Sequence, residues 1–126
     1  LNDIRVQTVE GLNARDVTRE LVPGPIDFIT ADLSFIGLAK ALPPALALAE
    51  PGAYLVALIK PQFEVGPGNV GKGGIVRDGE LHRRVCADIA HWLSDDMAWR
   101  VIGIAESPIA GGDGNVEFLI AASHDR

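Results

Sequence analysis

The apolar residues of this 126-residue chain fall into short runs, and their spacing predicts alternating strands and helices. The most continuous run covers residues 53–59 and leads directly into Lys60, with Pro51-Gly52 in front of it and Pro61 behind it. An unalternating apolar run between such breakers is typical of a strand buried on both faces, as in a parallel sheet. We therefore expect Lys60 at the carboxyl end of a central strand, the edge of an α/β sheet where ligands bind. On this pattern alone, a lysine that marks where the strand meets water is the simpler interpretation.

The remaining runs predict an order of β–β–α–β–loop–α–β–β. Alternating strands and helices favour a parallel sheet with helices on its faces. The short link before the final strand favours one antiparallel strand at the end of the chain. The predicted strands are 4–9 (an edge strand), 26–30, 53–59, 99–106 and 116–122, and the predicted helices are 37–50 and 79–93.

Prolines and glycines modify this outline at two places. Pro43-Pro44 is tolerated only in the first turn of a helix, so a helix that begins near Leu42 after an irregular turn fits the 37–50 segment better than a continuous one. Residues 61–78 are rich in glycine and predict a long functional or disordered loop, which could fold over a substrate. Asp78 is placed to cap the helix that follows.

Composition narrows the classes of function. A hydrophobic content of 48% supports one domain with a real core, and a net charge of −6 makes the chain a poor nucleic-acid binder on its own. With Cys86 as the only cysteine, no internal disulfide can form, and a cytoplasmic location is expected. Cys86 is interpreted as a buried small hydrophobe and not as a nucleophile. No signal peptide or membrane span is predicted, and the start at Leu1 suggests a fragment of a longer polypeptide.

Three charged residues occupy comparable positions at strand ends. Asp32 follows the second predicted strand, Lys60 ends the third, and Glu117 begins the last. If the last strand is antiparallel, all three lie at one edge of the sheet. Two carboxylates and an amine there could position a proton acceptor and stabilise developing negative charge. Three independent surface charges are the alternative. No histidine pair has metal-ligand spacing with a third partner, so no metal site is assigned.

Five motifs occur along the chain in this order: ADLSFI at 31–36, LIKPQFE at 58–64, GGIVRD at 73–78, SPI at 107–109 and GNVEFL at 114–119. Together they give the chain a close resemblance to the TlyA/haemolysin A family of FtsJ-like methyltransferases. The resemblance covers nearly the whole chain. It implies a Rossmann-like methyltransferase sheet, mostly parallel with one antiparallel terminal strand and without the amino-terminal part of the domain, so that residues 1–126 form a partial S-adenosylmethionine-dependent methyltransferase domain.

The resemblance also implies a reaction and its residues. Members are similar to enzymes that methylate the ribose 2′-hydroxyl of ribosomal RNA with S-adenosylmethionine, through a Lys-Asp-Lys-Glu set. Asp32, Lys60 and Glu117 match its last three members, and the cofactor is expected near Asn13, Ala14, Asp32 and Leu33. The first lysine, the glycine-rich cofactor loop and an S4-like RNA-binding domain would lie before Leu1.

This absence shapes what we expect of the chain itself. Two carboxylates favour the charged form of Lys60, which would then stabilise an alkoxide electrostatically while Asp32 and Glu117 orient it. The isolated chain is expected to be inactive and to bind the cofactor weakly, with ribosomal RNA or a ribosomal subunit bound by regions outside it. Two alternatives remain: a non-catalytic scaffold that forms a homodimer through an unpaired sheet edge, and a haemolysin-like activity.

Overall fold

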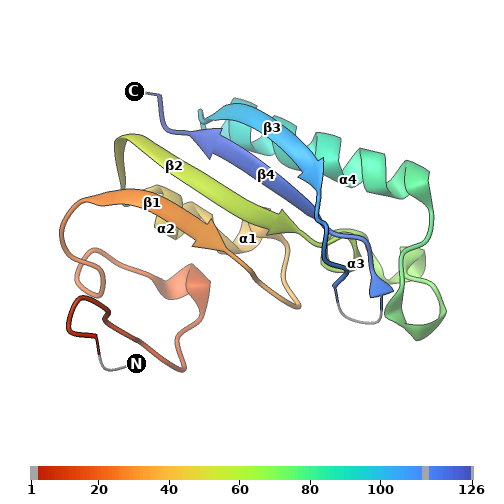
Figure 1. Ribbon diagram of the computed structural model, residues 1–126, viewed down its shortest axis with the longest axis horizontal. Helices are drawn as coiled ribbons and strands as arrows, with labels where there is room; N and C mark the ends of the chain where they lie inside the picture. The colour runs from red at the N-terminus through yellow and green to blue at the C-terminus, as the bar shows by residue number, and fades with distance from the viewer. Residues whose placement is uncertain (1–2, 112–113, 126) are drawn as a thin grey trace.

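The computed structural model describes residues 3–111 and 114–125 and contains one four-stranded sheet with the order β1-β2-β4-β3 (Figure 1). Strands β1 and β2 are parallel, and β4 is antiparallel to both β2 and β3. The predicted mixed α/β sheet is confirmed, with the last strand of the chain antiparallel and inserted between β2 and β3. The strands are β1 Ile26–Ala31, β2 Ala49–Ile59, β3 Arg100–Glu106 and β4 Phe118–Ser123, and the α-helices are α1 Leu38–Ala41, α2 Pro43–Leu46, α3 Pro61–Glu64 and α4 Gly79–His91.

The predicted edge strand at residues 4–9 is wrong. This segment forms no strand, and Ile4, Val6 and Val9 are exposed. Alternation of apolar and polar residues is not sufficient for a strand, because the backbone must also form hydrogen bonds with a neighbouring strand. The segment that follows instead forms a 3₁₀ turn, Ala14–Asp16, which is capped by Asn13.

The helix predicted at 37–50 is split into two single turns by its prolines. Pro43 and Pro44 occupy the first two positions of α2, where their missing N–H groups cost nothing. The chain enters β2 at Ala49, four residues before the predicted start at 53. Gly52 has a φ of +86°, which accommodates the register shift against β1 that lets the strand continue through Pro51.

Alternate residues of the two central strands form the core. Leu55 and Ile59 of β2 and Ile120 of β4 are fully buried, and they belong to one cluster with Val85 and Ile89 of α4. Burying a side chain of this size contributes about 1.5–3 kcal/mol. Helix α4 was predicted at 79–93 and ends in a π-helical turn, Trp92–Asp96.

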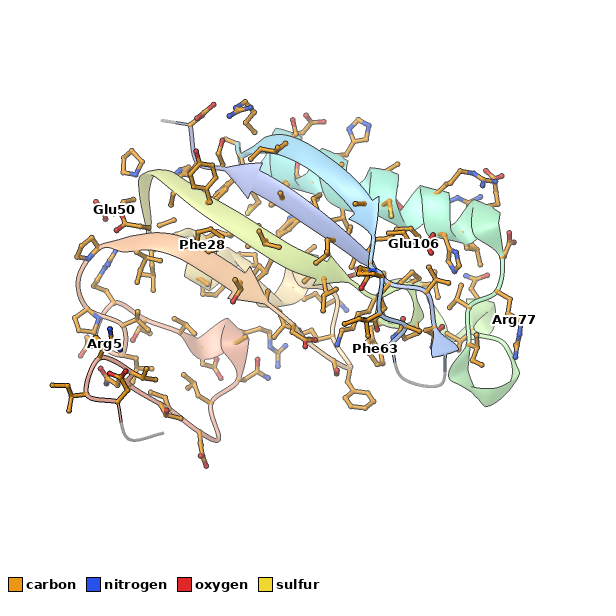
Figure 2. The ribbon with its side chains drawn as sticks, viewed as in Figure 1. Arg5, Phe28, Glu50, Phe63, Arg77 and Glu106 are labelled. Carbon is orange, nitrogen blue, oxygen red and sulfur yellow. The ribbon has the colours of Figure 1, made fainter. Side chains whose placement is uncertain are left out.

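The helices α1, α2 and α4 all lie on one side of the sheet, behind it in Figure 1. The opposite side, which we call the open face, is formed by Phe28, Tyr54, Val56 and Leu58, none of which is buried. Phe28, which is labelled in Figure 2, is 57% exposed. Tyr54 is 49% exposed, and the two ring centroids lie 6.4 Å apart. Within residues 3–111 and 114–125, no helix has the length and apolar character needed to cross a bilayer.

Candidate active site

The site begins where β2 turns into a single helical turn. Lys60 follows the last residue of β2 in extended conformation and is the N-cap of α3, Pro61–Glu64. The carbonyl of Lys60 accepts a hydrogen bond from the N–H of Phe63 at 2.9 Å. Because Pro61 presets the backbone for a first helical turn and needs no acceptor for an N–H, the sequence Lys-Pro fixes Lys60 at the strand end.

Lys60 forms an ion pair with the residue that follows the neighbouring strand. Its Nζ lies 2.5 Å from Oδ1 of Asp32, and it also donates to Oγ of Ser34 at 3.3 Å. The Lys60 side chain is 12% exposed and that of Asp32 is 71% exposed. The ammonium is therefore sheltered, and its counter-charge lies at the water boundary.

Glu117 reaches the same place from the antiparallel strand. It directly precedes β4 and is 6% exposed, and its Oε2 accepts a hydrogen bond from Nε2 of Gln62 at 2.9 Å. The chain passes close on the other side at Gly111, where a Cβ would lie 1.9 Å from Oε2 of Glu117. Any side chain at position 111 would therefore have to displace the carboxylate of Glu117 from its present place.

Asp32, Lys60 and Glu117 line one cavity of about 560 Å³, together with the loop of residues 107–111. The predicted convergence of the three side chains at one sheet edge is therefore what the structure contains. Their arrangement differs from the expectation in one respect, since Lys60 pairs with Asp32 while the hydrogen bond of Glu117 goes to Gln62.

A second cavity of about 400 Å³ adjoins the first at Lys60 and Glu117, and aromatic rings line it. Phe35 is 89% exposed, and its ring centroid lies 5.0 Å from that of Phe63, which is on α3 and is labelled in Figure 2. The φ of Phe35 is +65°, a conformation that a non-glycine residue adopts at a cost. The ring is thus held in an exposed position at the mouth of the site.

Asn115 ties the glycine-rich segment to the start of β4. Its buried amide accepts from the N–H of Val76 and donates to the carbonyl of Gly74, both at 2.9 Å. The predicted long loop therefore carries specific anchors, and it contains α3 and two 3₁₀ turns, Pro67–Asn69 and Lys72–Gly74. Gly74 and Asn115 both line the second cavity, so their hydrogen bond positions this part of the cavity wall.

Glu64 joins α3 to the segment after β1. Its Oε2 accepts a hydrogen bond from the N–H of Leu38, the first residue of α1, at 2.9 Å. Burial raises the pKa of Glu64, and this hydrogen bond opposes the rise in part. The turn α3 and its N-cap Lys60 thus contact the segment after β1, the start of α1 and Glu117.

Of the residues predicted to bind a cofactor, only Asp32 lines the larger cavity. Leu33 is half-buried next to Asp32, at the carboxyl end of β1. Asn13 is exposed, and its Oδ1 accepts from the N–H of Arg15 as the cap of Ala14–Asp16. Neither Asn13 nor Ala14 lines the cavity that holds Asp32 and Lys60.

Sequence reasoning missed two contacts of the site. Ser34 and Gln62 both stand inside motifs of the chain, two residues after Asp32 and Lys60, but neither was given a role. A polar residue two positions after each candidate was the available signal. In the part of the chain that the structure describes, no three His, Cys, Asp or Glu side chains gather in a way that could hold a metal ion.

Comparison with known proteins gives this geometry a context. The family model of FtsJ-like methyltransferases matches residues 1–124. The chain is 44% identical over 119 residues to the 16S/23S rRNA (cytidine-2′-O)-methyltransferase TlyA of Mycobacterium tuberculosis, covering 94% of this chain and 44% of that protein. It is also 44% identical over 121 residues to the putative rRNA methyltransferase YqxC of Bacillus subtilis, covering 94% of this chain and 42% of that protein.

A solved structure agrees with the sequence comparisons. A putative hemolysin from Lactococcus lactis superimposes with a TM-score of 0.91 at 38% identity, over 98% of this chain and 59% of that one. The chain spans less than half the length of the two curated relatives. The resemblance to TlyA-like proteins and the methyltransferase fold are both confirmed, and the chain belongs to the FtsJ-like methyltransferase family.

Proposed function

We propose that the protein carrying this chain transfers a methyl group from S-adenosylmethionine to the ribose 2′-hydroxyl of ribosomal RNA. The observation that carries the proposal is the sheltered Lys60–Asp32 ion pair in a cavity that Glu117 also lines. The family supplies methyl transfer as the class of reaction, and the names of two relatives supply ribosomal RNA as the substrate and, for TlyA, a cytidine 2′-oxygen as the target.

In the proposed mechanism, Lys60 acts on the 2′-oxygen. A ribose hydroxyl is a weak acid, so its oxygen must lose the proton, or nearly so, as it attacks. The ammonium of Lys60, fixed by Asp32 and Ser34, stabilises the negative charge that develops on this oxygen. Glu117 adds a second carboxylate to the cavity and is the candidate to receive or relay the proton.

The chain offers part of a cofactor site. S-adenosylmethionine supplies an electrophilic methyl group when it is bound. Asp32 and Leu33 suit it, because an exposed carboxylate and a half-buried apolar side chain follow β1 at the carboxyl edge of the sheet. Asn13 and Ala14 remain proposed contacts for the adenosine end. We propose that residues 1–126 are one part of the methyltransferase domain, and that the isolated chain binds the cofactor weakly and is inactive.

The substrate is proposed to meet this chain through stacking more than through charge. With a net charge of −6, the chain offers little attraction for phosphates, and regions outside it are proposed to hold the RNA or the ribosomal subunit. The exposed ring of Phe35 at the mouth of the smaller cavity gives an unpaired base a surface on which to stack. From a substrate of this kind we propose a cytoplasmic location.

Methyl incorporation into unmodified ribosomal RNA tests the proposal. We expect Lys60→Ala in the protein that carries this chain to lower the rate by about 100-fold or more, because charge stabilisation and positioning are lost together. Lys40→Ala is the matched control, since Lys40 is an exposed lysine on α1, and its rate should match the wild type. Equal rates for the two variants would remove Lys60 from the mechanism.

A further inference from the structure

We propose that Gln62 is a positioning residue, which holds the carboxylate of Glu117 in a fixed place relative to Lys60. The inference deepens the proposed methyl transfer and rests on it for its functional part. Gln62 lies on α3 two residues after Lys60, so one helical turn carries both side chains into the site. Its Nε2 crosses to Glu117, 55 positions away in the chain, at 2.9 Å.

The carboxylate of Glu117 has one hydrogen-bond donor and one close backbone neighbour. Gln62 donates to Oε2, and the backbone of Gly111 approaches so closely that a Cβ there would lie 1.9 Å from the same oxygen. A buried carboxylate without a donor is costly, so this amide hydrogen bond is what allows Glu117 to stay at 6% exposure. Removing the donor should let the carboxylate turn away from the cavity.

The two ends of the Gln62 amide differ in their hydrogen bonding. Oε1 of Gln62 is buried and has no hydrogen-bond partner among the described residues. Such a group costs free energy, and native structures hold few of them. The hydrogen bond to Glu117 therefore sets the orientation of the Gln62 amide, although this orientation leaves Oε1 without a donor. Gln62 and Lys60 line the same cavity.

An acid could not replace the amide at this position. Two carboxylates at hydrogen-bond distance must share a proton, so a glutamate at 62 would repel Glu117 until one of them is protonated. The ionisable groups that line the cavity with Glu117 are Asp32 and Lys60, and these are already paired with each other. With Glu117, these groups already carry a formal net charge of −1, and a glutamate at 62 would add a second negative charge.

The first test uses the full 126-residue chain and needs no activity. We expect Gln62→Glu to lower the melting temperature by about 4 °C or more at pH 8 and by less at pH 5, because protonation relieves the repulsion. Adding Glu117→Gln should restore it, since the exchanged pair re-forms the hydrogen bond in the opposite direction. Gln7→Glu, at the other glutamine of the chain and exposed, is the control. Melting of Gln62→Glu that equals the control at both pH values would overturn the proposal.

The second test follows methyl transfer as a function of pH in the protein that carries this chain. We expect Gln62→Met, which keeps the side-chain length, to lower kcat at least 10-fold with little change in KM for RNA, and to move the acidic limb of the profile upward. A lower rate with an unchanged profile would mean a merely structural role and would overturn the proposal. If the wild type transfers no methyl group, the proposed function fails, and the melting comparison alone supports or overturns the Gln62–Glu117 contact.

Discussion

At the scale of single residues, the charged side chains of the site differ strongly in their exposure to solvent. Lys60 is sheltered, and its partner Asp32 faces water. An ammonium held in this way loses much of its hydration but keeps a counter-charge, so it interacts strongly with any oxygen that enters the cavity. Glu117 is buried opposite, and an amide rather than a cation holds it. The account of the reaction therefore depends on a few side-chain contacts.

Glu64 gives a prediction at this scale. Burial raises its pKa above the ordinary value of 4.5, so the folded state binds the proton more tightly than the unfolded state does. Stability linked to Glu64 is therefore full below pH 4.5 and is lost as the pH rises through the raised pKa. Glu64→Gln keeps an acceptor for Leu38 and carries no charge.

We expect the stability of Glu64→Gln relative to the wild type to increase from pH 4 to pH 7, as measured by urea unfolding at each pH. Glu10→Gln, in the exposed amino-terminal segment, should show no such trend. A relative stability that stays constant, or that falls with rising pH, would contradict the assignment.

At the scale of elements, strand ends were predictable and side-chain pairing across the site was not. The unbroken apolar run at 53–59 fixed Lys60 at a strand end, and the same logic placed Asp32 and Glu117. At residues 4–9, alternation of apolar and polar residues predicted a strand, but no neighbouring strand pairs with this segment and none forms. The contact from Gln62 to Glu117 depends on how α3 is turned, and no local pattern encodes that orientation.

Helix α4 tests the capping argument. Asp78 accepts a hydrogen bond from the N–H of Glu80 at 2.8 Å and caps the helix as the sequence predicted. We expect Asp78→Ala to lower the free energy of unfolding by about 1 kcal/mol, because the N–H groups of the first turn lose their acceptor. Asp88→Ala, at an exposed position inside the same helix, should change it by less than about 0.5 kcal/mol in the same denaturation experiment. Equal losses would contradict the cap.

At the scale of the whole molecule, one face of the sheet is covered and one is open. The helices stand behind the sheet in Figure 1, and Phe28 and Tyr54 lie on the open face. Strand β1 is also the edge of the sheet, with hydrogen-bonding groups along one side. An apolar face next to an unpaired edge favours association, which is the basis for proposing a homodimer of the isolated chain.

We expect the mass of the isolated chain, measured by light scattering, to rise with concentration. The double substitution Phe28→Ser and Tyr54→Ser should reduce this rise, because the apolar area available for association shrinks. Ile4→Ser with Val6→Ser is the matched control, since both residues are exposed outside the sheet. A clean monomer at every concentration for the unsubstituted chain would refute self-association through the open face.

The central claim is that Lys60, Asp32 and Glu117 act together on a ribose oxygen. Its most direct test is mass spectrometry of the nucleosides released from ribosomal RNA after reaction with the protein that carries this chain and labelled S-adenosylmethionine. The account predicts label in a 2′-O-methylated nucleoside, formed about 100-fold or more slowly by Lys60→Ala. Label on a base, or a ribose label that Lys60→Ala forms at the wild-type rate, would contradict it.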